Sequence, residues 1–92
     1  MDTIEILKNH KKKIEKKYNV KRIGIFGSYA KGKQTKSSDI DIIVEFTNPT
    51  FDNFMDLIFY LEDLYGKEID LVTLKGLSPY IVPFVEKEVI WC

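Results

Sequence analysis

The segment DIDIIVEF, at residues 39–46, constrains the fold most because it joins a strand-forming pattern to two closely spaced acids. β-Branched and aromatic residues favour a strand, and side chains along a strand point alternately to its two faces. Asp39 and Asp41 therefore share one face, while the apolar residues at the alternate positions occupy the other. The chain must build a sheet that buries one face and accommodates two like charges on the other.

Helix and strand patterns alternate along the rest of the chain. Apolar residues at spacings of three and four predict helices, with Thr50 as an N-cap and Gly66 as a stop for the second long one. Ser78 and Pro79 predict the start of the last helix, as a capping residue followed by a first-turn proline. The expected helices cover residues 3–18, 28–32, 51–65 and a segment from 78 onward, and the expected strands cover 20–26, 39–46, 67–74 and 89–92.

This order predicts an α/β sheet with helices packed mainly on one side. The strands at 39–46 and 67–74 are joined through a full helix, so a parallel pairing is possible and a mixed sheet stays open. Strand order does not follow from the pattern. With 92 residues the chain fits one domain, residues 1–92, whose modest size would gain stability from a bound partner or from oligomerisation.

Composition excludes several classes of protein. No apolar run approaches the ~20 residues of a membrane-spanning helix, and the first residues lack the basic start of a secretion signal, so we expect a cytoplasmic protein without a membrane partner. The single cysteine, Cys92, predicts a free thiol.

Charge is distributed unevenly along the chain. Residues 1–38 hold eleven Lys or Arg against three acids, and residues 39–92 hold three lysines against eleven acids. This asymmetry predicts an anionic ligand or partner on one side and cations on the other. For the lysines of residues 8–17, a solvated helix face is the simpler interpretation.

The paired acids require a positive charge between them. Burying two carboxylates on one strand face without compensation is costly, and a divalent cation with oxygen ligands, typically Mg²⁺, would compensate them. Asp70, in the apolar segment KEIDLVTL, would add a third carboxylate if its strand lies beside that of Asp39 and Asp41. Glu68 lies on the same face and competes with Asp70 for this role.

Gly27 and Ser28 supply a second feature, a strand that turns directly into a helix. Free backbone N–H groups at the positive end of a helix accommodate phosphate. Gly27 would let the backbone approach the ligand closely, and the Ser28 hydroxyl would donate a hydrogen bond to a phosphate oxygen. Lys31 is the one nearby lysine that we name as a possible phosphate contact.

These residues together resemble the signature of the DNA polymerase β-like nucleotidyltransferase superfamily. The signature is glycine, serine, about ten residues, then aspartate, an apolar residue and aspartate, here Gly27, Ser28, Asp39 and Asp41. The segments GSYAKG and SSDIDIIVEF are similar to the corresponding sequences of the minimal nucleotidyltransferases (MNT). Asp70 matches a later strand aspartate, and the resemblance continues to LSPYIVPFVEKEVIW, near the end of the chain.

The resemblance implies a polymerase β-like fold, a small mixed β-sheet flanked by helices. It also implies transfer of a nucleoside monophosphate from an NTP, such as ATP, to a hydroxyl with two Mg²⁺ ions. Asp39 and Asp41 would bind both ions and Asp70 one of them, with a possible second role for Asp70 as proton acceptor. Many relatives have arginine at the position of Lys31, and lysine lacks its bidentate fork.

The family further implies a partner, a helical HEPN ribonuclease toxin. The MNT protein would act as its antitoxin by transferring AMP to a tyrosine of the toxin. Two alternatives stay open: a catalytically weak binding module that neutralises the toxin by contact, and nucleotidyl transfer to a small molecule or RNA. We do not expect a nucleic-acid partner, although the basic helix at residues 8–17 keeps RNA open, and a homo-oligomer is left open as well.

Overall fold

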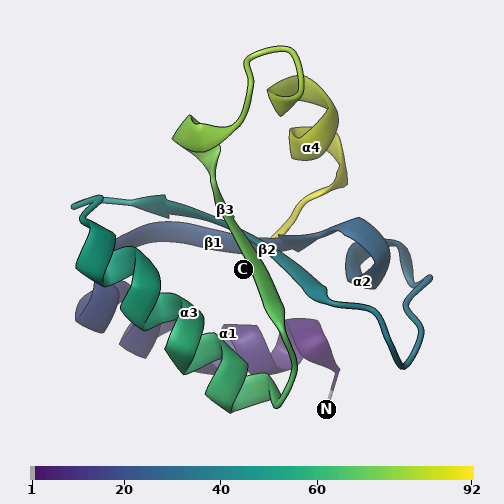
Figure 1. The fold of residues 1–92 in the computed structure, drawn as a ribbon, viewed down its shortest axis with the longest axis horizontal. Coiled ribbons are helices and arrows are strands. Elements are labelled where there is room, and N and C mark those ends of the chain that lie inside the picture. The colour runs from purple at the N-terminus through teal and green to yellow at the C-terminus, as the bar shows by residue number, and fades with distance from the viewer. Residues whose placement is uncertain (1) are drawn as a thin grey trace.

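Helices and strands alternate along the chain in the computed structural model, which describes residues 2–92. Figure 1 shows them as a sheet with two long helices along one side and the remaining helices elsewhere on its rim. The helices are α1 (Thr3–Tyr18), α2 (Gly27–Lys31), α3 (Phe51–Tyr65) and α4 (Val82–Glu88), with one 3-10 turn, η1 (Leu74–Gly76); the strands are β1 (Val20–Phe26), β2 (Ile40–Phe46), β3 (Ile69–Thr73) and β4 (Ile90–Trp91).

The two long helices begin and end at residues that satisfy their free backbone groups. The Asp2 carboxylate accepts a hydrogen bond from the backbone of Glu5 at the start of α1, and Thr50 caps α3 as predicted. Asn19 and Gly66 end these helices in the left-handed conformation, with φ of 57° and 63°. None of the helices in residues 2–92 combines the length and the apolar content that crossing a membrane would demand.

The four strands form one mixed sheet in the order β3-β2-β1-β4. β1 pairs antiparallel with both β2 and β4, while β2 and β3 pair in parallel. The parallel pairing left open by the sequence is therefore present, and α3 provides the crossover between the two strands. This pairing decides the site, because it sets Asp41 and Asp70 directly opposite each other.

One face of the sheet packs against α1 and α3, as expected from the sequence. Alternate residues of β2, Ile40, Ile42 and Val44, belong to a buried cluster with residues of both helices, among them Leu7 and Leu57. The interleaved residues of β2 necessarily point to the other face. The acids thus lie on the side that the two long helices leave uncovered.

Some predicted boundaries were wrong. The last helix begins at Val82 and not at Ser78. The backbone carbonyl of Ser78 accepts hydrogen bonds from Ile81 and Val82, which closes a turn first. Pro83 then sits in the first turn, where a missing N–H costs nothing. β1 has the predicted bounds, but the other three strands are shorter than expected: Asp39 precedes β2, β3 covers Ile69–Thr73 and β4 covers Ile90–Trp91.

Candidate active site

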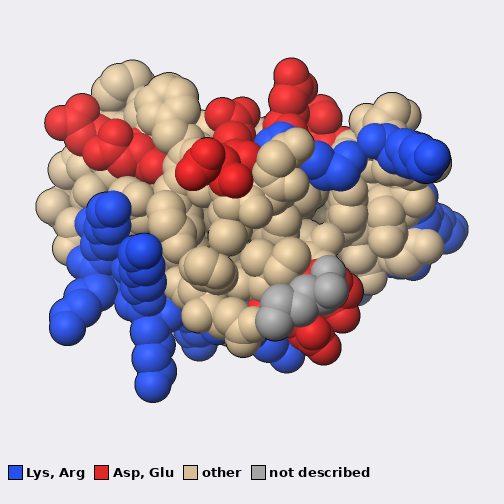
Figure 2. Space-filling view, turned by 90° about the horizontal axis from the view of Figure 1, so that it is seen from below, with Lys and Arg blue, Asp and Glu red and all other residues tan. Residues whose placement is uncertain are grey.

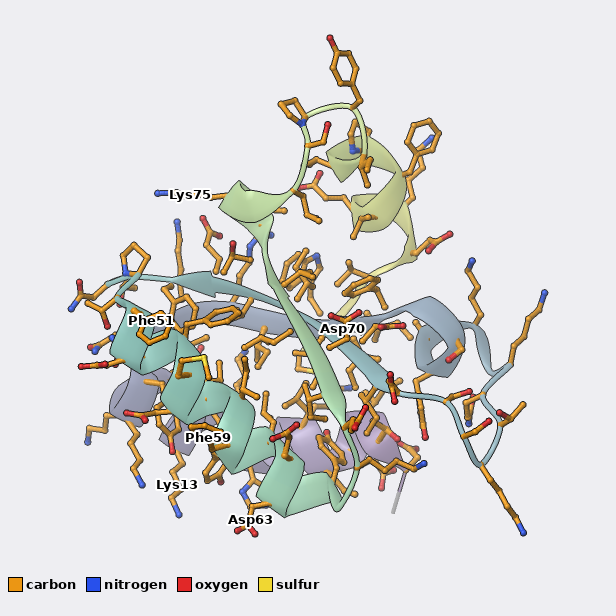
Figure 3. The ribbon with its side chains drawn as sticks, in the orientation of Figure 1. Lys13, Phe51, Phe59, Asp63, Asp70 and Lys75 are labelled. Atoms are coloured by element: carbon orange, nitrogen blue, oxygen red, sulfur yellow. The ribbon has the colours of Figure 1, made fainter. Side chains whose placement is uncertain are left out.

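Two of the predicted carboxylates lie opposite each other on the parallel strand pair, and the third is close enough to act on them by its charge. Asp41 and Asp70 are partners in the register of β2 and β3, and Asp39 lies immediately before β2. Asp41 is half-buried, while Asp39 and Asp70 are exposed. Figure 3 shows Asp70 in the middle of the molecule, well separated from Phe59 and Asp63 on α3. The sheet therefore brings Asp41 and Asp70 together, with Asp39 at the start of the same strand.

The acids influence one another electrostatically. Burial raises the pKa of Asp41, and the charge of Asp70, a side-chain hydrogen bond with Asp70 and the charge of Asp39 raise it further. All four contributions act in the same direction, because each one favours the neutral form of the Asp41 carboxyl group over the charged form. The site stores repulsion that a bound cation would relieve.

Gly27 packs directly against Asp41. Its φ is +69°, a backbone conformation that residues other than glycine rarely adopt. A Cβ atom at this position would also collide with Oδ2 of Asp41 and lie 3.0 Å from its Cγ. Glycine is thus required twice, once for the backbone and once for the approach of the carboxylate. The backbone turn and the acids are parts of one site.

Ser28 and Lys31 extend the site along α2. Ser28 lies in the first turn of this helix, directly after Gly27. The ammonium group of Lys31 lies 3.0 Å from a carboxylate oxygen of Glu88 on α4. Glu88 was not anticipated as a partner, and the pairing offers Lys31 a role other than phosphate contact.

The three acids fit a hard divalent cation by their chemistry. They offer carboxylate oxygens, which Mg²⁺ prefers, and the two ion pairs found within residues 2–92, Arg22 with Glu45 and Lys31 with Glu88, leave all three unneutralised. The side chains in the described part of the chain do not form a ready-made ligand cluster of three or more His, Cys, Asp or Glu. Asp39, Asp41 and Asp70 are the residues that could hold the ion.

The same sheet face carries a group that the sequence analysis missed. The guanidinium of Arg22 stacks over the ring of Trp91 at 4.1 Å and donates to Glu45 at 2.8 Å. Trp91 can approach because β1 has Gly24 opposite it, where a Cβ would lie 3.1 Å from the indole ring. A glycine inside an apolar strand is the sequence signal for such a close approach.

Comparison with known proteins agrees with this geometry. Residues 7–92 match the family model described as "Nucleotidyltransferase domain". A Methanocaldococcus jannaschii protein, named as a protein adenylyltransferase, is 47% identical over 91 residues, covering 95% of this chain and 91% of its own length. Protein adenylyltransferase MntA of Thermococcus cleftensis is 40% identical over 87 residues, covering 94% and 88% of the two chains.

Solved structures share the fold. One described as a minimal nucleotidyltransferase has a TM-score of 0.80 and 31% identity, covering 98% of this chain and 95% of its own. A toxin-antitoxin structure with AMP-PNP has a TM-score of 0.74 and 27% identity, covering 90% and 69% of the two chains. A third, at a TM-score of 0.68 and 22% identity over 97% and 71%, contains a tri-AMPylated Shewanella oneidensis HEPN toxin with its MNT antitoxin and shows likeness of fold alone.

These matches cover almost the whole chain, and within it Gly27 contacts Asp41, which lies in register with Asp70. The resemblance to the minimal nucleotidyltransferases is therefore confirmed, as is the mixed sheet flanked by helices that it implies. The chain belongs to the nucleotidyltransferase domain family and is a nucleotidyltransferase of the minimal type.

Proposed function

We propose that this protein transfers AMP from ATP to a tyrosine hydroxyl of a partner HEPN toxin and thereby acts as its antitoxin, with Mg²⁺ as cofactor. The observation that carries the proposal is the contact between Gly27 and Asp41, with Asp70 in register beside Asp41. A backbone turn suited to phosphate and a group of acids suited to a cation are thereby adjacent. Nucleotidyl transfer needs both at one point.

The acceptor is inferred from the relatives. Relatives at 47% and 40% identity carry the name protein adenylyltransferase, and the structural neighbours include toxin-antitoxin complexes, one with AMP-PNP and one with an AMPylated HEPN toxin. These descriptions favour ATP as the donor and a protein as the acceptor. Tyrosine as the acceptor residue follows from the family resemblance.

Each residue has a distinct role in the proposed reaction. Asp39, Asp41 and Asp70 would hold two Mg²⁺ ions, which supply charge stabilisation for the attacking and leaving oxygens of an in-line displacement. The Gly27 backbone and the Ser28 hydroxyl would orient the triphosphate so that pyrophosphate leaves along α2. Asp70, exposed at the edge strand, is also placed to accept the proton of the incoming hydroxyl.

The proposal is tested by following a label from ATP to the partner. Purified protein, Mg²⁺ and the HEPN partner are incubated with ATP radiolabelled at either the α- or the γ-phosphate. We expect label on the partner only from the α-position, and mass spectrometry should place an AMP increment on a tyrosine. Label from the γ-position would instead indicate phosphoryl transfer and contradict the proposal.

Matched variants connect the transfer to the acids. Asp39→Asn together with Asp41→Asn should reduce transfer to background. Glu15→Gln together with Glu62→Gln removes the same number of charges from α1 and α3, on the other side of the sheet, and should leave transfer intact. Equal transfer by both double variants would refute the assigned site.

Direct binding to the toxin is a second candidate function. Tyr80, Ile81 and Phe84 are large apolar residues exposed in and before α4, and exposed apolar groups of this kind commonly mark protein contacts. If binding alone neutralises the toxin, the Asp39→Asn, Asp41→Asn protein will still suppress the ribonuclease. Suppression that disappears with transfer would assign the antitoxin effect to the chemistry.

A further inference from the structure

A groove opens between α1 and α3, on the side of the molecule that does not carry the acids of the active site. Its volume is about 550 Å³, and it is lined by Lys17, Tyr18, Asp56, Phe59, Tyr60 and Asp63. The two tyrosines are buried or half-buried and form the floor, while the other four residues are exposed and form the rims. Neither the nucleotide site nor the proposed transfer reaction uses this groove.

The α3 rim is an acidic stripe with an aromatic residue in it. Asp52, Asp56, Phe59 and Asp63 follow one another at spacings of four, three and four, so they lie in one line along the helix. The Phe59 side chain is 59% exposed. Together with the groove beside it, this exposed ring offers apolar surface to a partner, flanked by acids that set the charge of that partner.

The α1 rim has the opposite charge. Lys13 and Lys17 are one turn apart, and their ammonium groups lie 5.7 Å and 5.6 Å from the ring centroids of Tyr60 and Tyr18. Figure 2 views this side and shows lysines and acids in separate rows, with uncharged surface between them. Within residues 2–92, neither rim forms an ion pair, so both keep their charge for a partner.

We propose that this face binds a second copy of the chain. The face presents a basic stripe and an acidic stripe side by side, which makes it complementary to itself. A two-fold axis along the groove would set α1 of each copy over α3 of the other and would place both Phe59 rings in the shared groove. A two-fold axis across the groove would oppose lysines to lysines, so charge selects the first arrangement.

The dimer leaves both nucleotide sites accessible. The acids lie on the sheet face opposite the one that α1 and α3 cover, so they would point outward in both copies. Each copy could then engage its own acceptor protein. Dimerisation and adenylyl transfer are separable, because their residues do not overlap.

Charge reversal and light-scattering mass determination test the dimer. We expect the wild-type protein to have twice the 10.8 kDa mass of one chain at low ionic strength. Lys13→Glu with Lys17→Glu, and separately Asp56→Lys with Asp63→Lys, should each weaken association by at least ~10-fold, since like charges then face each other. An equimolar mixture of these two variants should form a heterodimer.

Control variants separate the groove from general charge and hydrophobic effects. Lys12→Glu with Lys16→Glu makes the same charge change on α1, but only Lys13 and Lys17 lie over the tyrosines of the groove floor, so the dimer should persist. Phe59→Ser should give a monomer, while Phe51→Ser, at a residue 75% exposed on the same helix, should not. Circular dichroism checks that every variant is folded.

Three results would overturn the proposal. They are a monomeric wild-type protein at all concentrations, a mixture of the two charge variants that fails to associate, and a dimer that Phe59→Ser leaves intact. If the chain is monomeric and the same variants weaken binding of the HEPN partner, the groove belongs to that partner instead. In either case the label-transfer assay still reports on the nucleotide site.

Discussion

The two faces of the sheet are built on opposite principles. The face under α1 and α3 is closed by fully buried side chains, including Ile42, Leu57 and Leu61. The other face holds Asp41 beside Asp70, whose charges repel. Burial of apolar area on the first face stabilises the folded protein, whereas repulsion between like charges on the second face destabilises it. The packed face, under α1 and α3, thus provides stability that offsets the repulsion on the chemical face, which holds Asp41 and Asp70.

The largest effect should come from opening the packed face. Leu57→Ala removes a fully buried side chain from α3 and leaves a cavity against the sheet. We expect a loss of about 2–5 kcal/mol in the free energy of unfolding, measured by urea denaturation. A loss below ~1 kcal/mol would show that the stability of the domain does not depend on this packing.

The next largest effect is expected at Gly27, where the backbone conformation and the contact with Asp41 both require glycine. Gly27→Ala forces a Cβ against the Asp41 carboxylate at a φ of +69°, and should cost about 1–3 kcal/mol and weaken ATP binding. Gly32→Ala is the matched control, because Gly32 has the same φ with nothing within 4 Å. Urea denaturation and calorimetric titration with ATP measure both losses. Equal values for the two variants would contradict the contact.

Replacing Asp41 with asparagine should relieve the repulsion on the chemical face. Because the pKa of Asp41 is raised in the folded protein, the folded state holds its proton more tightly than the unfolded chain does. The stability from this group is complete below the unfolded pKa and is lost as pH rises through the folded pKa. Asp41→Asn should therefore stabilise the protein at neutral pH, by about 0.2–1 kcal/mol without divalent cations.

Magnesium with ATP should make the wild type more stable than the Asp41→Asn variant, the reverse of the order without divalent cations. The wild type should gain thermal stability on addition of Mg²⁺ and ATP, because ligands that bind only the folded state stabilise it. The Asp41→Asn variant should gain much less. Differential scanning fluorimetry with and without a chelator measures both changes, and an equal gain would show that the ligand does not use Asp41.

The sequence predicted the chemical face better than the boundaries of the elements. Alternation in DIDIIVEF placed Asp41 on the face opposite Ile42, because that pattern depends on local geometry, and the resemblance to the nucleotidyltransferase signature linked Asp41 to Gly27. Strand order and the Lys31–Glu88 contact depend on the tertiary fold and left no local signal. The start of α4 was misjudged because the turn at Ser78 carries the same capping chemistry as a helix.

The smallest effect is expected at the ion pair between Lys31 and Glu88, which joins α2 to α4 across the chemical face. Both side chains are largely exposed, so Glu88→Gln should change the free energy of unfolding by no more than about 0.5 kcal/mol. Its effect on ATP is more informative. If Glu88 holds Lys31 away from phosphate, the variant will bind ATP more tightly in calorimetric titration, whereas unchanged affinity would assign Lys31 to the contact between helices and leave phosphate to Gly27 and Ser28.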